Sequence, residues 1–394
     1  MRDDVVIVGA GPAGARAAFV LASRGARVTI VDASHPREKP CGGGVTGRAL
    51  ALVADAMDAA DCPASVIRSA RFTDAGGRRS AVVALDDHGA SAASALLVAE
   101  RATFDASLLV AAERAGAVLD RSRVTNVTFE ARGATLETTS GVRRAGFVIG
   151  ADGANSLVRR RVATPFRRDQ LSIATGFFAH GVTSDEIVIE LTSDPPGYLW
   201  SFPRPTHLAI GICAQANAGV PAAALRARAA RWIASTGIAD GARLEPYSWP
   251  IPALGASDFD TVALAGPRWA LAGDAAGLVD PITREGIYFA LASGQWIADA
   301  LSNGGARRYE SRVRDDAISE LAGAARLKAG LFRPAFTGLM MRALQDSRAI
   351  REVMADLVAG RQPYRSLKWR LLRTFEWRLA MKALVTVSVR RAPL

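Results

Sequence analysis

The chain has 394 residues, of which 49% are hydrophobic and 22% are charged, and these proportions are typical of a globular protein with a sizeable core. The formal net charge is +11, but residues 361–394 hold nine basic residues and one glutamate, so most of the excess lies in the tail. This distribution predicts an enzyme-like body with a basic end and argues against a nucleic-acid-binding domain.

The cysteines and the apolar runs indicate the cellular compartment. Cys41, Cys62 and Cys213 have neither paired nor metal-type spacing, which favours a reducing compartment without a disulfide framework or a zinc site. No signal peptide precedes the first strand, and no apolar run approaches the roughly 20 residues that span a bilayer. We therefore expect a cytoplasmic protein.

The first 32 residues indicate a strand, a glycine-rich loop, a helix and a second strand. Val5 to Val8 form an apolar, β-branched run that is typical of a buried parallel strand. Helical sequence follows from Ala15 to Ser23, and a second strand from Arg27 to Val31 ends in Asp32. The intervening loop is a G-x-G-x-x-G fingerprint formed by Gly9, Ala10, Gly11, Pro12, Ala13 and Gly14.

In this context the fingerprint predicts a dinucleotide-binding site, and a simple glycine turn is the disfavoured alternative. Gly9 permits a tight turn, Gly11 allows the backbone to approach a pyrophosphate, and Gly14 lets the helix lie close to the strand. The helix N-terminus offers free N–H groups and a positive dipole end to the phosphates. Asp32, eighteen residues after Gly14, is placed to accept hydrogen bonds from a ribose.

The loop from Ala33 to Thr46 contains three consecutive glycines, Gly42 to Gly44, directly after Cys41. Such a run is unsuited to the interior of a helix or strand, and it allows the backbone to approach a flat ligand closely. A lone cysteine is usually a small buried residue, and the loop alone favours that interpretation of Cys41.

Helices and a hairpin are predicted before residue 120. We expect a helix from Arg48 to Ala60, and a hairpin from Arg71 to Leu85 that turns at two glycines. A helix from Ala106 to Ala115 and a short strand from Gly116 to Leu119 follow.

An R-x-x-F-D pattern precedes the second of these helices. It places Arg101 just before the helix N-terminus, where a guanidinium can reach a second phosphate or a ring system. Asp105 is expected to cap the helix.

Strands dominate from residue 124 to residue 260. A predicted β-meander ends in an Asp152-Gly153 turn, and its strands are Val124 to Glu130, Ala134 to Thr139 and Arg143 to Ile149. Residues 162–260 predict an inserted antiparallel sheet with one helix, Pro221 to Ser235, and with strands Leu171 to Ala179, Glu186 to Leu191, Tyr198 to Phe202 and Leu208 to Ala214.

Aromatic residues alternate in the third of these inserted strands. Tyr198, Trp200 and Phe202 are two residues apart, so they share one face of the strand. An aromatic core stripe and a substrate-facing wall are equally compatible with this pattern.

A strand of the first domain returns after the insertion. Trp269 to Ala272 predicts a buried strand that opens into Gly273-Asp274-Ala275-Ala276-Gly277, and a helix from Tyr288 to Ser302 follows. The fold class is therefore α/β, with a discontinuous Rossmann-like domain, an inserted mainly antiparallel β-sheet domain and a C-terminal helical segment. We assign residues 1–70, 98–161 and 262–306 to the Rossmann-like domain. Residues 71–97 and 162–261 form the β-sheet domain, and residues 307–394 form the C-terminal segment.

The C-terminal segment contains a basic amphipathic helix. Between Tyr364 and Leu384, apolar residues recur at helical spacing among arginines and lysines, and Trp369 and Trp377 flank them. This composition suits an anionic membrane surface, which would make the protein peripheral to the membrane. A closing helix that packs on the body and leaves its charges solvated is the equally open alternative.

The four histidines are scattered along the chain. We expect each of them to be a surface or packing residue, and we expect no metal site; they are His35, His88, His180 and His207.

Taken together, the motifs resemble the geranylgeranyl reductase family, which belongs to the flavoprotein group of the single-component aromatic hydroxylases. The fingerprint with its acid, the R-x-x-F-D, the Asp-Gly and the G-D-A-A-G resemble the whole group and imply FAD. The Cys-Gly-Gly-Gly after Pro40 and the G-Y-x-W-x-F-P from Gly197 to Pro203 resemble the reductases in particular. This combination makes Cys41 an expected active-site residue.

The resemblance also implies contacts with FAD. The backbone of Ala10 to Gly14 would hold the pyrophosphate, Asp32 the adenosine ribose and Asp274 the ribityl or pyrophosphate part, while Arg101 would lie near the phosphates. Backbone N–H groups of Gly286 and Ile287 would stabilise the reduced ring at its pyrimidine end. The further cofactor contacts that the resemblance implies are Gly9, Ala33, Cys41, Gly42, Gly43, Val124, Asp152 and Gly273.

The family resemblance implies reduction of isolated double bonds in polyprenyl chains. Cys41 and Tyr198 are the candidates for proton delivery, and Tyr198, Trp200 and Phe202 would line a substrate tunnel. NAD(P)H or reduced ferredoxin would visit the flavin transiently, because no second dinucleotide fingerprint follows the first. Where many relatives have glycine, Arg284 is expected to touch the flavin or narrow the site.

Two other functions are compatible with the same motifs. A flavin monooxygenase shares the fold, although the Cys-Gly-Gly-Gly loop argues against it. A non-catalytic flavin- or lipid-binding protein, anchored by its basic tail, is the less favoured alternative.

Overall fold

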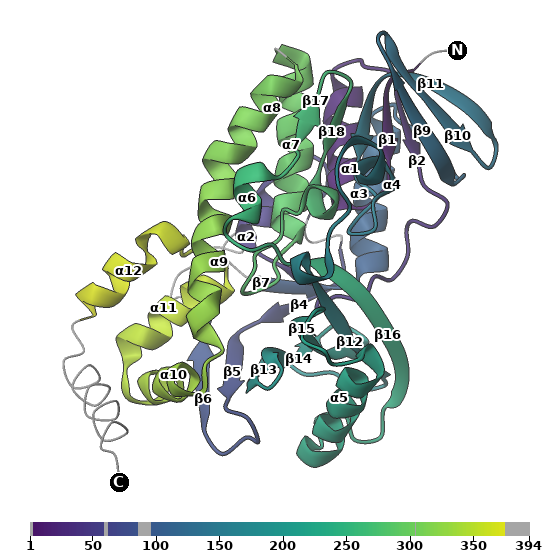
Figure 1. Ribbon diagram of the computed structural model, residues 1–394. Helices are drawn as coiled ribbons and strands as arrows, with labels where there is room; N and C mark the ends of the chain where they lie inside the picture. The colour runs from purple at the N-terminus through teal and green to yellow at the C-terminus, as the bar shows by residue number, and fades with distance from the viewer. Residues whose placement is uncertain (1–2, 59–61, 86–95, 304, 375–394) are drawn as a thin grey trace.

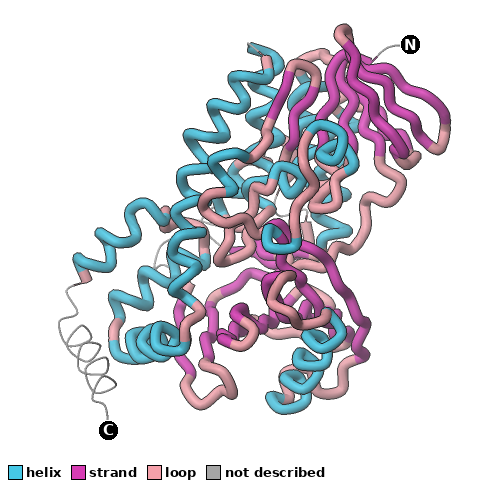
Figure 2. The backbone as a smooth tube through the Cα atoms, viewed as in Figure 1, coloured by secondary structure: helices cyan, strands magenta, loops and turns pink. Residues whose placement is uncertain are grey.

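The structure is a computed structural model, which describes residues 3–58, 62–85, 96–303 and 305–374 (Figure 1). Two large sheets lie one above the other in this view, and the helices α8 (Ala306–Val313) and α9 (Ser319–Leu331) run along one side of them (Figures 1 and 2). The molecule is therefore a mixed α/β protein, as the sequence predicts.

The first sheet has eight strands and is organised around β1 (Asp3–Val8). Five strands run parallel in the order β18-β11-β1-β2-β8, and β17 pairs antiparallel with β18 at one edge. Strands β9 and β10 extend β11 as an antiparallel meander. The bounds are β2 (Val28–Val31), β8 (Val118–Asp120), β9 (Val124–Glu130), β10 (Gly133–Thr138), β11 (Gly141–Gly150), β17 (Ala265–Gly266) and β18 (Trp269–Leu271).

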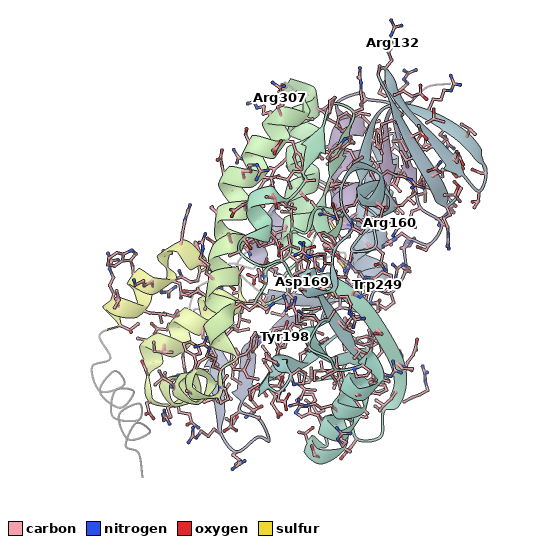
Figure 3. The ribbon with its side chains drawn as sticks, in the orientation of Figure 1. Arg132, Arg160, Asp169, Tyr198, Trp249 and Arg307 are labelled. Carbon is pink, nitrogen blue, oxygen red and sulfur yellow. The ribbon has the colours of Figure 1, made fainter. Side chains whose placement is uncertain are left out.

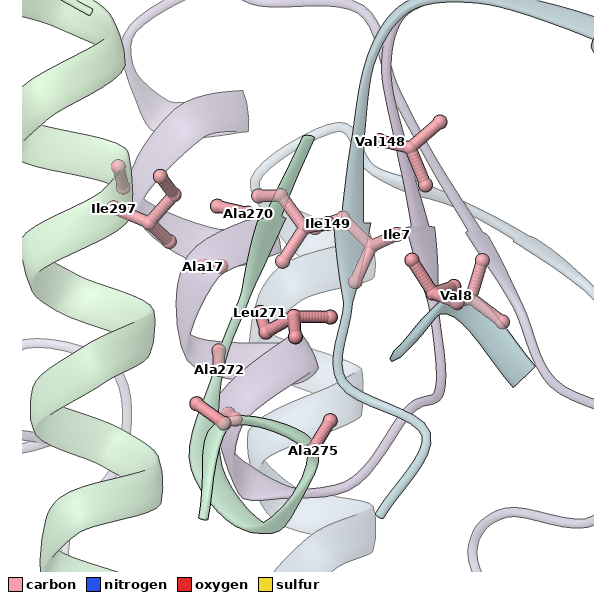
Figure 4. Packing of buried hydrophobic residues seen from close by; sticks show 14 of the residues in the cluster. Ile7, Val8, Ala17, Val148, Ile149, Ala270, Leu271, Ala272, Ala275 and Ile297 are labelled. Atoms are coloured by element: carbon pink, nitrogen blue, oxygen red, sulfur yellow. The ribbon is translucent and has the colours of Figure 1, made fainter. Parts of the chain in front are cut away.

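Alanine-rich helices cover this sheet closely. Helix α1 (Pro12–Ser23) packs between α3 (Arg101–Arg114) and α7 (Ile287–Asn303). Small side chains let α1 and α7 approach, because a Cβ on Gly294 would lie 2.4 Å from the Ala13 carbonyl oxygen. Figure 4 shows the resulting core, in which Ala17, Ile297, Ile7, Ile149 and Leu271 pack together.

The second sheet has seven strands in the order β16-β12-β15-β14-β13-β5-β6. Its pairs are antiparallel except β13 with β5, which brings an early hairpin beside the inserted strands. Helix α5 (Ala222–Thr236) packs on β12 and β15. The bounds are β5 (Ser69–Thr73), β6 (Ser80–Ala84), β12 (Leu171–His180), β13 (Glu186–Ser193), β14 (Pro196–Pro203), β15 (His207–Gln215) and β16 (Arg243–Pro252).

A third, small sheet and several short helices complete the described fold. A small sheet has the order β3-β7-β4, and a π-helical turn from Arg314 to Ile318 joins α8 to α9. These elements are β3 (Gly44–Val45), β4 (Ala64–Ile67), β7 (Leu96–Ala99), α2 (Gly47–Ala51), α4 (Leu157–Val162), α6 (Asp258–Thr261) and the 3-10 turns Arg168–Gln170 and Gly273–Ala276.

The C-terminal helices cover the outer strands of the second sheet. Helices α10 (Pro334–Asp346) and α11 (Arg348–Val358) pack on β6, and α12 (Tyr364–Arg373) packs on α9. Among the helices that the structure describes, none combines the length and the apolar character that crossing a bilayer needs.

Most predicted elements are confirmed, and the return of β18 to the first sheet confirms its discontinuous course. The predicted helix from Arg48 to Ala60 is wrong in extent, because α2 ends at Ala51 and turns follow. Strand β16 was not anticipated, since Pro246 and Pro250 interrupt its strand pattern; prolines are tolerated there because β16 is an edge strand.

Candidate active site

The fingerprint glycines are required by backbone contacts. A Cβ on Gly9, whose φ is +104°, would lie 2.4 Å from the Ala151 carbonyl oxygen, and one on Gly14 would lie 2.0 Å from the Gly9 oxygen. A Cβ on Gly11 would meet only the His35 ring, at 3.7 Å, and Gly11 precedes α1 without a side-chain cap. The first N–H groups of α1 are thus left for an anion, so this cradle fits the pyrophosphate of a dinucleotide.

Asp32 lies directly beside the fingerprint loop. Its carboxylate accepts hydrogen bonds from Ala10 N (2.9 Å), Ser34 N (2.7 Å) and His35 Nδ1 (2.9 Å). Burial by itself raises the pKa of Asp32, but the hydrogen bond and charge of His35 hold that pKa well below its usual range. The carboxylate therefore stays ionised, and a ribose hydroxyl would share it with these donors.

A line of buried charged groups leads from Asp32 to Cys41. His35 Nε2 lies 3.5 Å from Asp105 Oδ2, and Arg101 donates to both Asp105 oxygens at 2.9 and 2.7 Å. The Arg101 guanidinium also interacts with the Cys41 thiol. Of the two alternatives that the sequence left for His35, the structure shows the buried, packed residue and not the surface one.

The capping role predicted for Asp105 is also wrong. Helix α3 begins at Arg101, and its N-cap position is Glu100. Asp105 lies one turn later and is buried, because a buried guanidinium needs a carboxylate partner at i,i+4 spacing.

The cysteine loop, residues 39–46, is held close to β7 and β14. A Cβ on Gly43, whose φ is +87°, would lie 2.3 Å from the Ala99 oxygen, and one on Gly42 would lie 3.0 Å from the Phe202 ring. Gly43 N donates to Cys41 Sγ at 3.2 Å. The glycines are thus needed for close approach, and Cys41 is half-buried at the cavity wall.

Arg204 is a site residue that sequence reasoning missed. It is fully buried and donates to the Cys41 carbonyl oxygen at 2.6 Å and to the Glu38 carboxylate. Glu38 in turn accepts from Ala102 N at 3.1 Å, in the first turn of α3. The available signal was an arginine directly after the G-Y-x-W-x-F-P motif, since an arginine at the end of an apolar strand needs buried acceptors.

The second strand–loop–helix unit faces the cysteine loop. Asp274 Oδ2 accepts from Lys39 Nζ at 2.9 Å, and Thr46 Oγ1 donates to Glu285 at 2.8 Å. Gly286 directly precedes α7, and a Cβ on it would lie 3.4 Å from Asp274 Oδ1. The N–H groups at this helix start are therefore placed for an acceptor, and the cofactor role expected for Gly286 and Ile287 stays a prediction.

A cavity of about 620 Å³ joins these loops to the second sheet and the C-terminal helices. Tyr198, Trp200 and Phe202 all line it, so the shared face predicted for them is confirmed. Tyr198, which Figure 3 labels, donates to the Thr283 carbonyl oxygen at 3.0 Å. The other predicted site residues on its wall are Pro12, Cys41, Gly42, Gly43, Arg101, Asp274, Gly286 and Ile287.

Several predicted cofactor residues lie outside the cavity wall. Asp152 accepts from Ser156 Oγ and from Leu157 N (2.6 Å), so its carboxylate holds the start of α4. Val124 begins β9, and Ala33 follows Asp32. The cofactor roles of these residues stay predictions.

Metal-binding and disulfide chemistry find no support in the described part of the chain. No cluster there has the three His, Cys, Asp or Glu ligands that a metal ion needs, and all three cysteines are free.

The glycine cradle, the parallel sheet and the joined cavity define the chain as a flavoprotein of the Rossmann-like class. A family model described as an FAD binding domain matches residues 2–292. A digeranylgeranylglycerophospholipid reductase of Methanothrix thermoacetophila is 31% identical over 356 residues, which cover 82% of this chain and 85% of that protein. A menaquinone reductase of Mycolicibacterium smegmatis is 33% identical over 335 residues, 79% of each chain.

A solved structure has the same fold. The geranylgeranyl bacteriochlorophyll reductase-like protein of Thermoplasma acidophilum superposes with a TM-score of 0.78 at 23% identity, over 95% of this chain and 99% of that chain. The chain belongs to the geranylgeranyl reductase family of FAD-dependent oxidoreductases.

Proposed function

We propose that the enzyme saturates carbon–carbon double bonds of a polyprenyl substrate. The observation that carries this proposal is the cavity, which runs from the cysteine loop and Gly286 to the apolar side chains of the C-terminal helices. FAD held by the fingerprint loop and the loop before α7 would, once reduced, supply a hydride to one alkene carbon, and a proton must reach the other carbon. The apolar residues on the helical side are Leu327, Leu331, Phe332, Phe336, Met340, Met354, Leu357, Val358, Leu367 and Leu371.

The chain's own residues exclude water and hold the proton. Trp200 and Phe202 cover the sheet side of the cavity with aromatic rings. Such a wall excludes water and suits an isolated alkene, which has no polar group to form hydrogen bonds. Cys41 is the proposed proton donor, because its thiol lies at the wall beside the buried Arg101. Burial raises the pKa of Tyr198 well above its usual range, so its hydroxyl keeps its proton and positions the Thr283 carbonyl.

We also propose that the mouth of the cavity faces an anionic membrane. Leu327, Phe336 and Leu371 line the cavity and are also exposed, by 46%, 44% and 40%. On α12, Trp369 and Leu372 are exposed, and basic side chains lie beside them in the sequence. Apolar and cationic side chains around a mouth suit a lipid surface, from which a prenyl chain can pass into the cavity.

The first test is an anaerobic single turnover. Flavin reduced with dithionite, which replaces the NAD(P)H or ferredoxin donor, is mixed with a geranylgeranyl lipid or diphosphate. We expect flavin reoxidation together with a mass gain of about two units per saturated bond. Reduced flavin that persists with every prenyl compound until air is admitted would contradict the proposal, and oxygen uptake would then support a monooxygenase.

The same assay tests the role of Cys41. We expect Cys41→Ser to retain FAD and to slow flavin reoxidation by about a hundredfold or more, the usual effect of losing a general acid. Cys62→Ala is the matched control, since Cys62 is buried away from this cavity. Equal rates in both variants would remove Cys41 from the mechanism.

A further inference from the structure

Arg284 has an unusual backbone conformation. Its φ is +62°, and among the described residues it is the one non-glycine residue with positive φ. A side chain in this region strains the backbone, and such strain persists where the surrounding structure holds it in place. Arg284 lies in the loop two residues before Gly286 and lines the cavity.

The Arg284 guanidinium is only partly satisfied. Nη2 donates to Ser172 Oγ at 2.7 Å, whereas Nε and Nη1 are buried without a hydrogen-bond partner. No carboxylate of the described residues lies within ion-pair distance, because Glu285 pairs with Arg48 and Asp280 accepts from backbone N–H groups. Buried N–H groups of a cation without an acceptor are costly, so this position favours an anionic ligand.

A second cation lies beside Arg284. Lys328 Nζ donates to Gln215 Oε1 at 2.6 Å, and Ser172 Oγ lies 3.5 Å from the same oxygen. Burial, and then the charge of Arg284, lower the pKa of Lys328 to about 7. Lys328 also has no carboxylate partner among the described residues, so these two neighbouring basic side chains lack a counter-charge here.

We propose that Arg284, with Lys328 next to it, forms an anion subsite that binds the phosphate of a prenyl phosphate substrate. That the phosphate is attached to a prenyl chain rests on the proposed function. Nε and Nη1 of Arg284 lie on different edges of the guanidinium, so each can give a phosphate oxygen its own charge-assisted hydrogen bond. The apolar remainder of the cavity then receives the prenyl chain.

The test compares phosphorylated and neutral ligands on the FAD-loaded enzyme by calorimetry. We expect geranylgeranyl diphosphate to bind at least about tenfold more tightly than geranylgeraniol, as for a charge-assisted contact. Arg284→Gly should bring this ratio close to one and leave geranylgeraniol affinity unchanged. The control is Arg307→Ala, an exposed arginine of α8 that lies outside the cavity lining (Figure 3).

Glycine suits a positive φ, so Arg284→Gly is expected to fold, and bound FAD gives an independent check. An unchanged ratio in Arg284→Gly would overturn the subsite. If neither prenyl compound binds any variant, the proposed function fails, and inorganic pyrophosphate tests the subsite alone. The subsite is supported if Arg307→Ala still binds pyrophosphate and Arg284→Gly does not. It is overturned if neither variant binds pyrophosphate or if both bind it equally.

Discussion

At the scale of single residues, His35 is the group whose environment differs most from its sequence context. Its ring lies between the carboxylates of Asp32 and Asp105, and its Nε2 would lie 3.7 Å from a Cβ on Gly11. Burial lowers the pKa of His35, but the hydrogen bonds and charges of Asp105 and Asp32 outweigh burial and raise that pKa above 6.5. The protonated ring therefore stabilises the fold next to the cofactor cradle.

The raised pKa predicts a pH dependence of stability. The contribution of His35 is fully present below its unfolded pKa, about 6.5, and is lost as pH rises through the higher folded pKa. We expect the free energy of unfolding in urea to fall in the wild type as the pH rises above about 6.5 and through the folded pKa, and to fall less in His35→Gln. His180→Gln is the control at a more exposed position, and its free energy of unfolding should fall with pH as in the wild type. The same fall with pH in all three proteins would refute the role of His35.

At the scale of elements, α12 combines two roles. Leu367 is buried at the cavity, whereas Trp369 and Leu372 point away from the core and are exposed by 66% and 56%. The sequence predicts this helix to Leu384; the part after Thr374, including Trp377, lies outside the described residues. The described turns alone place apolar side chains beside the mouth that Leu371 lines.

We expect these side chains to carry membrane binding. The double variant Trp369→Ser with Leu372→Ser should bind vesicles that contain phosphatidylglycerol at least about tenfold more weakly, because two apolar contacts are lost. Val142→Ser is the matched control, since Val142 is also exposed, on the distant β11 hairpin. Sedimentation with vesicles measures both variants, and equal binding would favour a closing helix with solvated charges.

At the scale of the whole molecule, the cofactor site joins segments that are distant in sequence. The fingerprint loop, the cysteine loop, α3 and the loop before α7 meet there, and ion pairs such as Lys39 with Asp274 connect them. A ligand that binds this assembly, but not the unfolded chain, must stabilise all of it together.

FAD should therefore raise the free energy of unfolding. At a hundred times its dissociation constant the expected gain is about 2.7 kcal/mol. Gly14→Ala should abolish the gain, because the added Cβ would lie 2.0 Å from the Gly9 oxygen and displace the cradle. Gly323→Ala is the control and should keep the gain, because the nearest atom to its new Cβ is 3.9 Å away. Urea unfolding with and without FAD measures the gain in each variant. A gain that Gly14→Ala retains would contradict the proposed cradle.

The local elements were predictable because their signals are contiguous. The apolar run of β1, the fingerprint glycines and the alternating strands of the meander each specify one element within a few residues of sequence. The extent of helix α2 was predicted wrongly, because turns end the helix at Ala51 although the following sequence favours a helix. Strand β16 was missed because its prolines disfavour a strand, although they are tolerated at the edge of a sheet.

Spacing along the chain was enough to predict the dinucleotide cradle, the discontinuous domain and the aromatic face of β14. The meeting of charges became visible only in the folded molecule: the pairing of Arg204 with Glu38, the position of His35 between two carboxylates, and the unmatched Arg284 beside Lys328. Burial makes the energy of a charge depend on partners that lie far away in sequence, and spacing carries no record of them.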